Sequence, residues 1–319
     1  MSEIMGKGVS LRWINNAGFE IILPGGAHLL VDPWLDRADI HPLPVEELER
    51  ADYVLLTHIH FDHADSIGDI QRKFPNVRIL VGDLSAEPLC RIANLNVEKL
   101  YRVRSGEVYE FADVKVEAIA GRHTESKRGS FYMQGANRRE DGQLDAAMWY
   151  GSLEMLNYRI TAADGTRIAV WGGMTTDEQV NRMAAYRDND IAVMHVSPKQ
   201  DTALFTALVN AMNPKVVIPH HYDLWDVMFK ANPGMLKDSP LPIEQMNEKY
   251  ILGMIRESIK EHCPNASFFI PEHQKWYRFG LGIWEAKVRH AVRNFSQQRG
   301  HTDRRSCRST LERPFSRTT

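Results

Sequence analysis

The chain has 319 residues, and its 39 Lys and Arg against 41 Asp and Glu give a formal net charge of −2 at pH 7. This length fits one large domain or two small ones, and the lack of a basic excess argues against a dedicated nucleic-acid-binding protein. Hydrophobic residues make up 43% and charged residues 25%, which excludes a chain that is disordered throughout.

The first third of the chain predicts strands followed by an alternation of strand and helix. Short apolar runs predict strands at 11–14, 19–23, 28–31, 53–56 and 77–81. Pro24-Gly25-Gly26 is a turn signal between the second and third of these strands. Between the last two, Ile67, Ile70 and Phe74 have the spacing of a helix.

The rest of the chain repeats this order. Strands are predicted at 108–119, 156–160, 167–171, 191–196 and 216–218, and helices near Thr202, near Leu224 and from Ile243 to His262. Asp164-Gly165 is a favoured two-residue hairpin turn. The duplication predicts an α/β fold in which two β-sheets pack face to face with helices outside, a four-layer αββα sandwich.

Two segments stand apart from this domain, which we place at residues 1–295. The polar stretch 124–153 exceeds the usual loop length and predicts a functional lid, an ordered insertion or a solvated loop. Its basic residues would favour an anionic small-molecule substrate, although charged loop residues are usually just solvated. The tail 296–319 is rich in arginine and poor in apolar residues, so we expect it to be disordered.

The cysteines and the N-terminus bear on the compartment. Cys90, Cys263 and Cys307 are widely spaced and odd in number, so they predict neither a disulfide scaffold nor a Cys-x-x-Cys metal site. The N-terminus lacks the apolar stretch of a signal peptide, and no run of about 18 apolar residues occurs. We therefore expect a cytoplasmic protein without a membrane span.

Four residues with metal-ligand chemistry lie within six positions, directly after the predicted strand 53–56. They are His58, His60, Asp62 and His63, and their spacing is expected by chance roughly 0.003 times in a chain of this composition. His58 and His60 lie two apart on an extended segment, so both imidazoles can reach one ion. Asp62 and His63 follow where the chain turns toward a helix and can face a neighbouring position. The segment predicts a metal site.

This motif and the predicted layers resemble the metallo-β-lactamase fold superfamily, whose signature is HxHxDH after a strand. The resemblance covers about residues 9–280 and is closest to the branch of ascorbate-phosphate lactonases and related phospholipid-cleaving phosphodiesterases. The opening LRWINNAGFEIILPGGAHLLVDPWL is similar to the start of that branch, with a structural role implied for Asp32. The branch usually has a histidine in its first turn, where this chain has Asn16.

The resemblance implies two further ligands. His123 follows a strand at the place of the family's next histidine and would complete a three-histidine set with His58 and His60. In VVIPHHYD the family's ligand stands just before the aromatic residue, which implies His221 rather than His220, and His221 would join Asp62 and His63 in a second set. The other histidines are expected to be structural or solvated: His28, His41, His195, His262, His273, His290 and His301.

One departure from the family concerns the carboxylate that normally bridges two metals from a Gly-Asp-Thr turn. This chain reads Trp171-Gly172-Gly173-Met174, with Gly173 where the aspartate would stand. Asp177 is an alternative source of a carboxylate, but Thr176-Asp177 reads more naturally as a helix N-terminal cap. We expect one ion to be bound more tightly than the other.

The residues and the resemblance together imply a metal-dependent hydrolase that uses a metal-bound hydroxide on a lactone, ester or phosphodiester. The cofactor would be one or two divalent ions, with zinc favoured and manganese or iron as alternatives. If the second ion is absent or weakly bound, Asp62 would be free to orient the attacking water or take its proton as a general base. The ligand content of the second set also matches the facial triad of ferrous iron, so an iron-dependent oxidoreductase or oxygenase on the same fold is the alternative.

Overall fold

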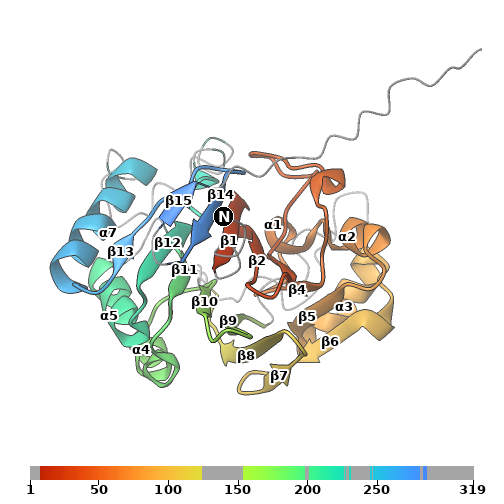
Figure 1. Ribbon diagram of the computed structural model, residues 1–319. Helices are drawn as coiled ribbons and strands as arrows, with labels where there is room; N and C mark the ends of the chain where they lie inside the picture. The colour runs from red at the N-terminus through yellow and green to blue at the C-terminus, as the bar shows by residue number, and fades with distance from the viewer. Residues whose placement is uncertain are drawn as a thin grey trace, which may run out of the picture. The chain divides into compact units, whose positions relative to one another are not determined.

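The computed structural model describes residues 8–123, 154–197, 201–225, 227, 230, 245, 247–280 and 283–285. Within them the chain forms two mixed sheets (Figure 1). The first runs in the order β15-β14-β1-β2-β3-β4-β5-β6, and β3 to β6 are parallel. Its strands are β1 (Val9–Asn15), β2 (Gly18–Ile22), β3 (His28–Val31), β4 (Tyr53–Leu55), β5 (Arg78–Gly82), β6 (Leu100–Val103), β14 (Trp276–Phe279) and β15 (Ile283–Glu285).

The second sheet runs in the order β13-β12-β11-β10-β9-β8-β7. Its strands are β7 (Val108–Glu110), β8 (Val114–Ala120), β9 (Leu156–Ala162), β10 (Arg167–Trp171), β11 (Ile191–His195), β12 (Val216–His220) and β13 (Ser267–Phe268). β10 to β13 are parallel, and the antiparallel hairpin of β9 and β10 turns at Gly165, whose φ of 88° suits glycine. Each sheet therefore joins an antiparallel half to a parallel half.

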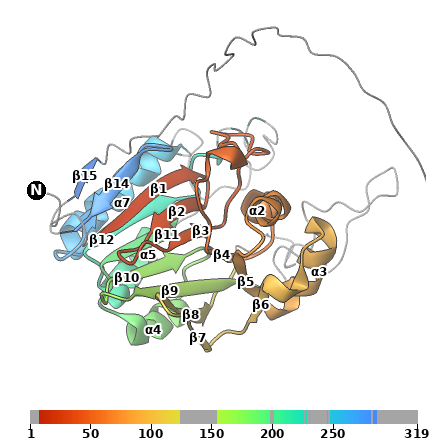
Figure 2. The same cartoon turned by 45° about the vertical axis from the view of Figure 1, so that its right-hand side comes forward.

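Helices cover the outer faces of the sheets (Figure 2). The first sheet is flanked by α1 (Phe61–Ala64), α2 (Ile67–Lys73) and α3 (Asp83–Ala93), and the second by α4 (Asp177–Met183), α5 (Thr202–Met212) and α7 (Glu248–His262). Short 3-10 helices lie at Val45–Glu47, Val97–Lys99 and Ala184–Tyr186. This is the predicted four-layer arrangement of helix, sheet, sheet and helix.

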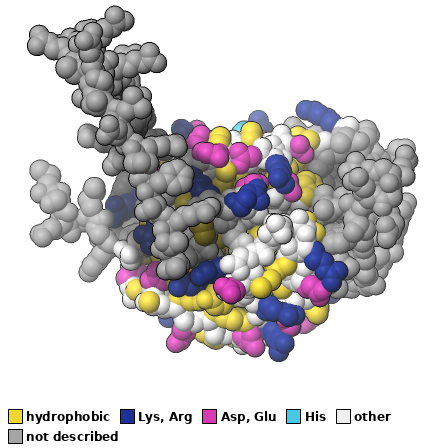
Figure 3. Space-filling model, turned by 90° about the vertical axis from the view of Figure 1, so that its right-hand side faces the viewer, with side chains coloured by type: hydrophobic (Ala, Val, Ile, Leu, Met, Phe, Trp, Pro, Cys, Tyr) yellow, Lys and Arg dark blue, Asp and Glu magenta, His cyan; other side chains and the backbone are white. Residues whose placement is uncertain are grey.

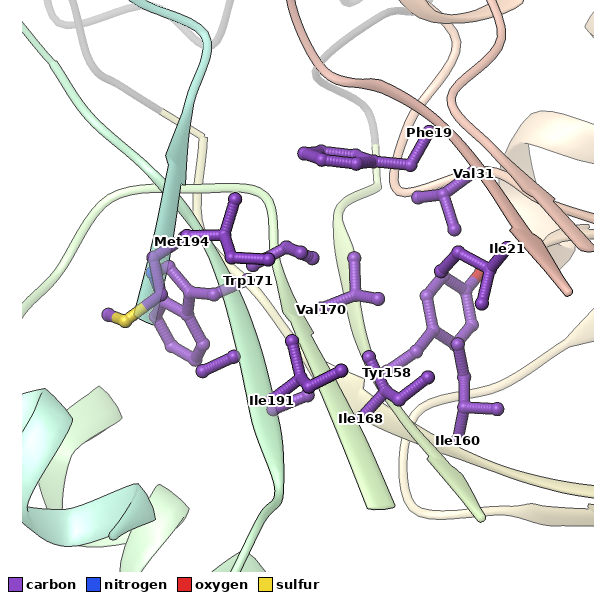
Figure 4. Packing of buried hydrophobic residues seen from close by; sticks show 14 of the residues in the cluster. Phe19, Ile21, Val31, Tyr158, Ile160, Ile168, Val170, Trp171, Ile191 and Met194 are labelled. Atoms are coloured by element: carbon purple, nitrogen blue, oxygen red, sulfur yellow. The ribbon is translucent and has the colours of Figure 1, made fainter. Parts of the chain in front are cut away.

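The space between the sheets is filled by apolar side chains from both (Figure 4). Phe19, Ile21 and Val31 of the first sheet face Tyr158 and Val170 of the second, and all five are at most 2% exposed. Such burial is the main stabilising term, at about 25 cal/mol per Å² of apolar surface removed from water. A smaller buried cluster, which includes Ile67 and Ile79, packs α2 against the other face of the first sheet.

Two helices differ from the sequence prediction. The last long helix was expected from Ile243 but begins at Glu248, where Asn247 accepts a hydrogen bond from the Tyr250 N–H and caps the helix. α3 was not predicted, and it contains Pro88, which normally interrupts a helical pattern. The insertion 124–153 and the tail 296–319 lie outside the described residues.

Two further features concern the charges on the surface and the length and apolarity of the helices. On the face shown in Figure 3, basic and acidic side chains are interspersed rather than segregated. Ion pairs between surface residues of the protein include Arg102 with Asp83 and Arg37 with Asp65. None of the helices in the described part of the chain has the length and apolarity that crossing a bilayer requires.

Candidate metal centre

The loop after β4 places four candidate ligands at one edge of the first sheet. After β4 the Leu56 N–H still donates to the Leu80 carbonyl, and the chain then turns so that His60 precedes the single-turn helix α1. His58 and His60 stand before this turn, and Asp62 and His63 stand within it. All four are at most 8% exposed. Contacts with the second sheet hold the loop, because the Thr57 carbonyl accepts from the Leu156 N–H at 2.8 Å.

The structure brings the six predicted ligands into two groups. His58, His60 and His123 form the first group, and in it one ligand atom of each residue lies within 4.8 Å of the others. His58 Nε2 lies 2.9 Å from His60 Nδ1, and the His123 ring is 4.9 Å from the His58 ring and 4.7 Å from the His60 ring between centroids. His123 comes from the segment after β8, so the first group joins the two sheets.

Asp62, His63 and His221 form the second group within the same 4.8 Å limit. Asp62 Oδ2 is its centre, at 3.4 Å from His221 Nε2 and 3.6 Å from His63 Nε2. His221 follows β12 of the second sheet directly, so this group also joins the sheets. The rings of His58 and His63 are 3.9 Å apart, which makes the two groups neighbours.

Asp32 fixes the orientation of two of these histidines. Its carboxylate accepts from the Thr57 N–H at 2.7 Å and the Thr57 hydroxyl at 2.6 Å, and it lies 2.9 Å from His63 Nδ1. Because a carboxylate only accepts, His63 carries its proton on Nδ1 and turns the Nε2 lone pair into the group. The Thr57 hydroxyl donates to Asp32, so it accepts from His58 Nδ1 at 3.1 Å, and His58 Nε2 is left unprotonated in the same way.

Asn16 lies on the other side of Asp62. Its side-chain amide donates to Asp62 Oδ2 at 2.9 Å and to the Asp62 backbone carbonyl at 3.2 Å. The backbone carbonyl of Asn16 accepts from the His221 N–H at 2.9 Å. Asn16, Asp32 and His221 have φ angles of 41°, 42° and 67°, in the left-handed region that costs a residue with a Cβ free energy. Such conformations cluster at sites that the surrounding structure holds in place.

Burial and charge set the protonation of the group members. Burial, together with the neighbouring histidines, lowers the pKa of His60 to about 3 and holds the pKa of His58 well below its usual value. Burial alone would raise the pKa of Asp62, but His63 and His221 hold it below its ordinary value. For His63, the carboxylates of Asp32 and Asp62 outweigh burial and raise the pKa. The lowered pKa values of His58, His60 and Asp62 favour the neutral imidazoles and the ionised carboxylate that ligate metals, whereas an ion bound at His63 would displace a proton.

These residues fit one or two divalent ions. Each group offers three donors of nitrogen and oxygen, the ligand types that zinc, manganese and iron accept. The His63 Nε2 atom is buried and has no hydrogen-bond partner among the described residues, which would be costly for a polar atom without a ligand. Asp62 is the one acidic member of the two groups within the described chain.

Gly173 stands at the position of the family's bridging carboxylate, and no larger side chain fits there without rearrangement of its neighbours. A Cβ built on Gly173 would lie 2.7 Å from Met155 Sδ and closer still to the backbone oxygen of Arg122. The φ of Gly173 is outside the left-handed region, so space rather than backbone conformation requires glycine here. Asp177 does not replace the carboxylate, because it is exposed in the first turn of α4, where Thr176 caps the helix through the Gln179 N–H.

The sequence prediction missed two contacts of the site. His195, expected to be structural or solvated, is 7% exposed, and its ring centroid lies 4.5 Å from that of His221. Asn16, at the family's histidine position, bonds Asp62 from 46 residues away in the chain. The sequence signal that could have found Asn16 was its place in the NNAG turn. His220 is separate from the site, since its Nε2 lies 3.0 Å from the Trp171 carbonyl.

Comparison with known families and proteins identifies relatives of this chain. A family model described as "Beta-lactamase superfamily domain" matches residues 10–221, more than half of the chain. A UPF0173 metal-dependent hydrolase of Aeropyrum pernix is 35% identical over 95 residues, and one of Koribacter versatilis is 24% identical over 118 residues. These matches cover 28% and 37% of this chain, and the chain spans 38% and 49% of those relatives' lengths.

Solved structures show the same fold at low identity. Igni18, a metallo hydrolase of Ignicoccus hospitalis, matches with a TM-score of 0.57 at 13% identity, over 86% of this chain and 100% of that one. CmlA, a diiron beta-hydroxylase of Streptomyces venezuelae, matches with a TM-score of 0.56 at 12% identity, over 86% of this chain and 54% of that one. At these identities the two likenesses bear on the fold alone.

Proposed function

The chain belongs to the beta-lactamase superfamily domain family, and from this premise we propose that it is a metal-dependent hydrolase of a lactone, ester or phosphodiester. The observation that supports the proposal is the pair of adjacent ligand groups, which present five histidines and one carboxylate at the edge where the two sheets meet. The matched relatives are named metal-dependent hydrolases, which favours hydrolysis over other chemistry.

We propose that His58, His60 and His123 hold one ion and that Asp62, His63 and His221 hold a second one, with zinc favoured. An ion bound there lowers the pKa of water toward about 7 and polarises a carbonyl or phosphoryl oxygen. Asp62 is the proposed catalytic residue: when the second ion is absent or weakly held, its ionised carboxylate is free to orient a water molecule and accept its proton. Asp32 holds His63 in the tautomer that leaves Nε2 available.

A second candidate rests on the ligand content of the second group. Two histidines and one carboxylate are the facial triad that binds ferrous iron in oxygenases. CmlA, which shares the fold, is a diiron beta-hydroxylase. The alternative function is therefore an iron-dependent oxidation of a small molecule.

Reaction with a defined panel of substrates separates the two candidates. The metal-free protein is loaded with Zn²⁺, Mn²⁺ or Fe²⁺ and assayed on lactones, phosphodiesters and simple esters with and without oxygen. We expect Zn²⁺ or Mn²⁺ to support hydrolysis of at least one class under anaerobic conditions. His60→Ala should remove this activity, whereas His262→Ala, at the exposed end of α7, should keep it. Turnover that requires both Fe²⁺ and oxygen would overturn the hydrolase proposal.

A further inference from the structure

Asn16 is buried at the turn between β1 and β2 and contacts both chain segments that supply the second ligand group. Its side-chain amide donates to the carboxylate and to the backbone carbonyl of Asp62, at 2.9 and 3.2 Å. Its backbone carbonyl accepts from the His221 N–H at 2.9 Å. The Asn16 side chain has no exposed surface, so water does not compete for these bonds.

The position of Asn16 is itself fixed by further contacts. Its N–H donates to Asp223 Oδ2 at 2.9 Å, and the same oxygen lies 2.8 Å from His273 Nε2. The Trp13 indole N–H donates to the Asn16 carbonyl at 3.0 Å, and the ring of His273 stacks on Trp13 with centroids 3.9 Å apart. The amide therefore reaches Asp62 from a rigid support rather than from a mobile loop.

The oxygen that Asn16 bonds is the one at the centre of the second group. Asp62 Oδ2 also faces His221 Nε2 at 3.4 Å and His63 Nε2 at 3.6 Å. A carboxylate oxygen has two lone pairs, so an amide donor on one of them determines where the other points. Among the described members of the two groups Asp62 supplies the negative charge alone, and Gly173 leaves no room for a second carboxylate. The orientation of one side chain thus decides how well the second ion is held.

We infer that Asn16 is a positioning residue for the second ion: its amide orients Asp62 Oδ2, and its carbonyl holds the backbone of His221. The inference rests on the proposed two-ion centre but not on the reaction catalysed there. A turn residue with a purely structural role would affect the stability of the fold without distinguishing one ligand group from the other. A positioning residue weakens the second group selectively.

The test is a calorimetric titration of the metal-free protein with Zn²⁺, carried out on the wild type and on Asn16→Gly. Glycine suits the φ of 41° and keeps the backbone N–H and carbonyl contacts, so the substitution removes the amide alone. We expect the binding step of the second group to weaken by about 10- to 100-fold, as found when an outer partner of a metal ligand is lost. The step of the first group should stay within twofold. His221→Ala identifies the second-group step, because it removes a ligand of that group only.

Asn189 provides a matched control. It is also buried, at 2% exposed, and its amide donates to the carbonyls of Tyr186 and Met212, away from the ligand groups. Asn189→Ala should lower the unfolding temperature and leave both binding steps unchanged. With Co²⁺ as the probe, the visible absorption of the second step should change in Asn16→Gly and not in Asn189→Ala.

Two results would overturn the inference. The first is an unchanged second step in Asn16→Gly, and the second is a loss of affinity shared equally by both steps or reproduced by Asn189→Ala. Asn16→Ala removes the same donor and gives an independent measurement if the glycine variant does not fold. Since the readout is metal affinity, a protein that binds as expected but hydrolyses none of the substrates would contradict the proposed function and leave the role of Asn16 supported.

Discussion

His220 and His221 are adjacent in the chain, but their side chains lie in different surroundings. His220 Nε2 faces the Trp171 carbonyl inside the sandwich, and burial lowers its pKa well below the usual value. His221 Nε2 lies 3.4 Å from Asp62 Oδ2. The left-handed φ of His221 accompanies this change of direction between consecutive residues. The family pattern implied His221 as the ligand, and the geometry favours the same assignment.

Substitution by alanine should separate these two roles. His220→Ala should lower the free energy of unfolding by about 1–3 kcal/mol, because it leaves a cavity and a carbonyl without its partner. Its zinc content, measured by mass spectrometry, should equal that of the wild type. His221→Ala should be nearly as stable as the wild type without metal but lose the second ion. Equal zinc losses in the two variants would contradict the assignment.

The first ligand group should respond uniformly to loss of any member. His58→Ala, His60→Ala and His123→Ala each leave two ligands for an ion that needs three from the protein. We expect each to weaken zinc binding by more than the roughly 100-fold upper range for loss of an outer partner. Equilibrium dialysis against a metal buffer measures this affinity. Full zinc content in all three variants at low free zinc would refute the first group as a metal site.

At the scale of the elements, the turn after β10 explains why the chain departs from its family. A Cβ on Gly172 would meet the side chain of Thr57, and a Cβ on Gly173 would meet the Arg122 backbone oxygen and the side chain of Met155. The sequence suggested that Gly173→Asp would restore the bridging carboxylate and raise the metal content. The structure opposes this idea, because the backbone oxygen of Arg122 occupies the space that the new side chain needs.

We therefore predict that Gly173→Asp and Gly173→Ala both destabilise the protein, by about 1–3 kcal/mol for overpacking of a filled site. Neither should raise the number of bound zinc ions above that of the wild type. Urea denaturation and metal analysis of the purified variants provide the two measurements. Gly25→Ala is a control for the loss of a glycine alone, since its Cβ would meet nothing within 4 Å and its φ lies outside the left-handed region. A rise in zinc content in Gly173→Asp would show that the turn can move.

The strands that were predicted each depend on a short apolar run. The predicted 28–31 and 167–171 match β3 and β10, the predicted 108–119 is two strands, β7 and β8, and the others differ at their ends. β6, β13, β14 and β15 were not predicted. α3 was missed because Pro88 masks its helical spacing, and the start of α7 was placed too early because the cap at Asn247 is a local hydrogen bond that periodicity does not report.

The residues of the candidate site also divide into those that a local sequence pattern predicts and those that it does not. His58, His60, Asp62 and His63 lie within one loop, so their spacing alone predicts a cluster. His123 and His221 reach it from the second sheet, and resemblance to a family was needed to select them. The contacts of Asn16 with Asp62 and of Asp32 with His63 depend on how β1 and β3 pack beside the loop, which no local pattern encodes.

At the scale of the whole molecule, several buried histidines are neutral in the folded protein. Burial is the largest cause that lowers the pKa of His58, His60, His195 and His220. In the unfolded chain these groups titrate near the ordinary value of about 6.5. Below that pH the unfolded chain binds more protons than the folded one, so the free energy of unfolding falls as the pH is lowered.

For the metal-free protein we predict a loss of stability between pH 6.5 and about 4, with His60 alone accounting for about 2 kcal/mol at pH 5. Its folded pKa of about 3 places the end of its contribution below that window. The raised pKa of His63 acts in the opposite direction, and the lowered pKa of Asp62 matters only below its ordinary value of 3.8. Urea denaturation at pH 7, 6 and 5 with a chelator tests the prediction. A stability that does not change with pH, or a slope unaltered by His60→Gln, would contradict it.

Both ligand groups join the two sheets, so an ion bound to either group would couple metal binding to the stability of the sandwich. The loop after β4 belongs to the first sheet, while His123 and His221 follow β8 and β12 of the second. An ion bound to the folded protein but not to the unfolded chain stabilises it by about 2.7 kcal/mol at a free concentration 100 times the dissociation constant.

Chelation should therefore lower the unfolding temperature by roughly 5 to 10 °C, given a shift of about 2–4 °C per kcal/mol in a chain of comparable size. Scanning calorimetry with zinc and with a chelator measures the shift. His60→Ala, on the loop of the first sheet, and His123→Ala, on the second sheet, should each abolish the part of the shift that depends on the first group, although they change opposite sides of the sandwich. His262→Ala on α7 should keep the full shift. If His123→Ala retained it, the ion would be held by the loop of the first sheet alone, and the coupling between the sheets would not pass through the metal centre.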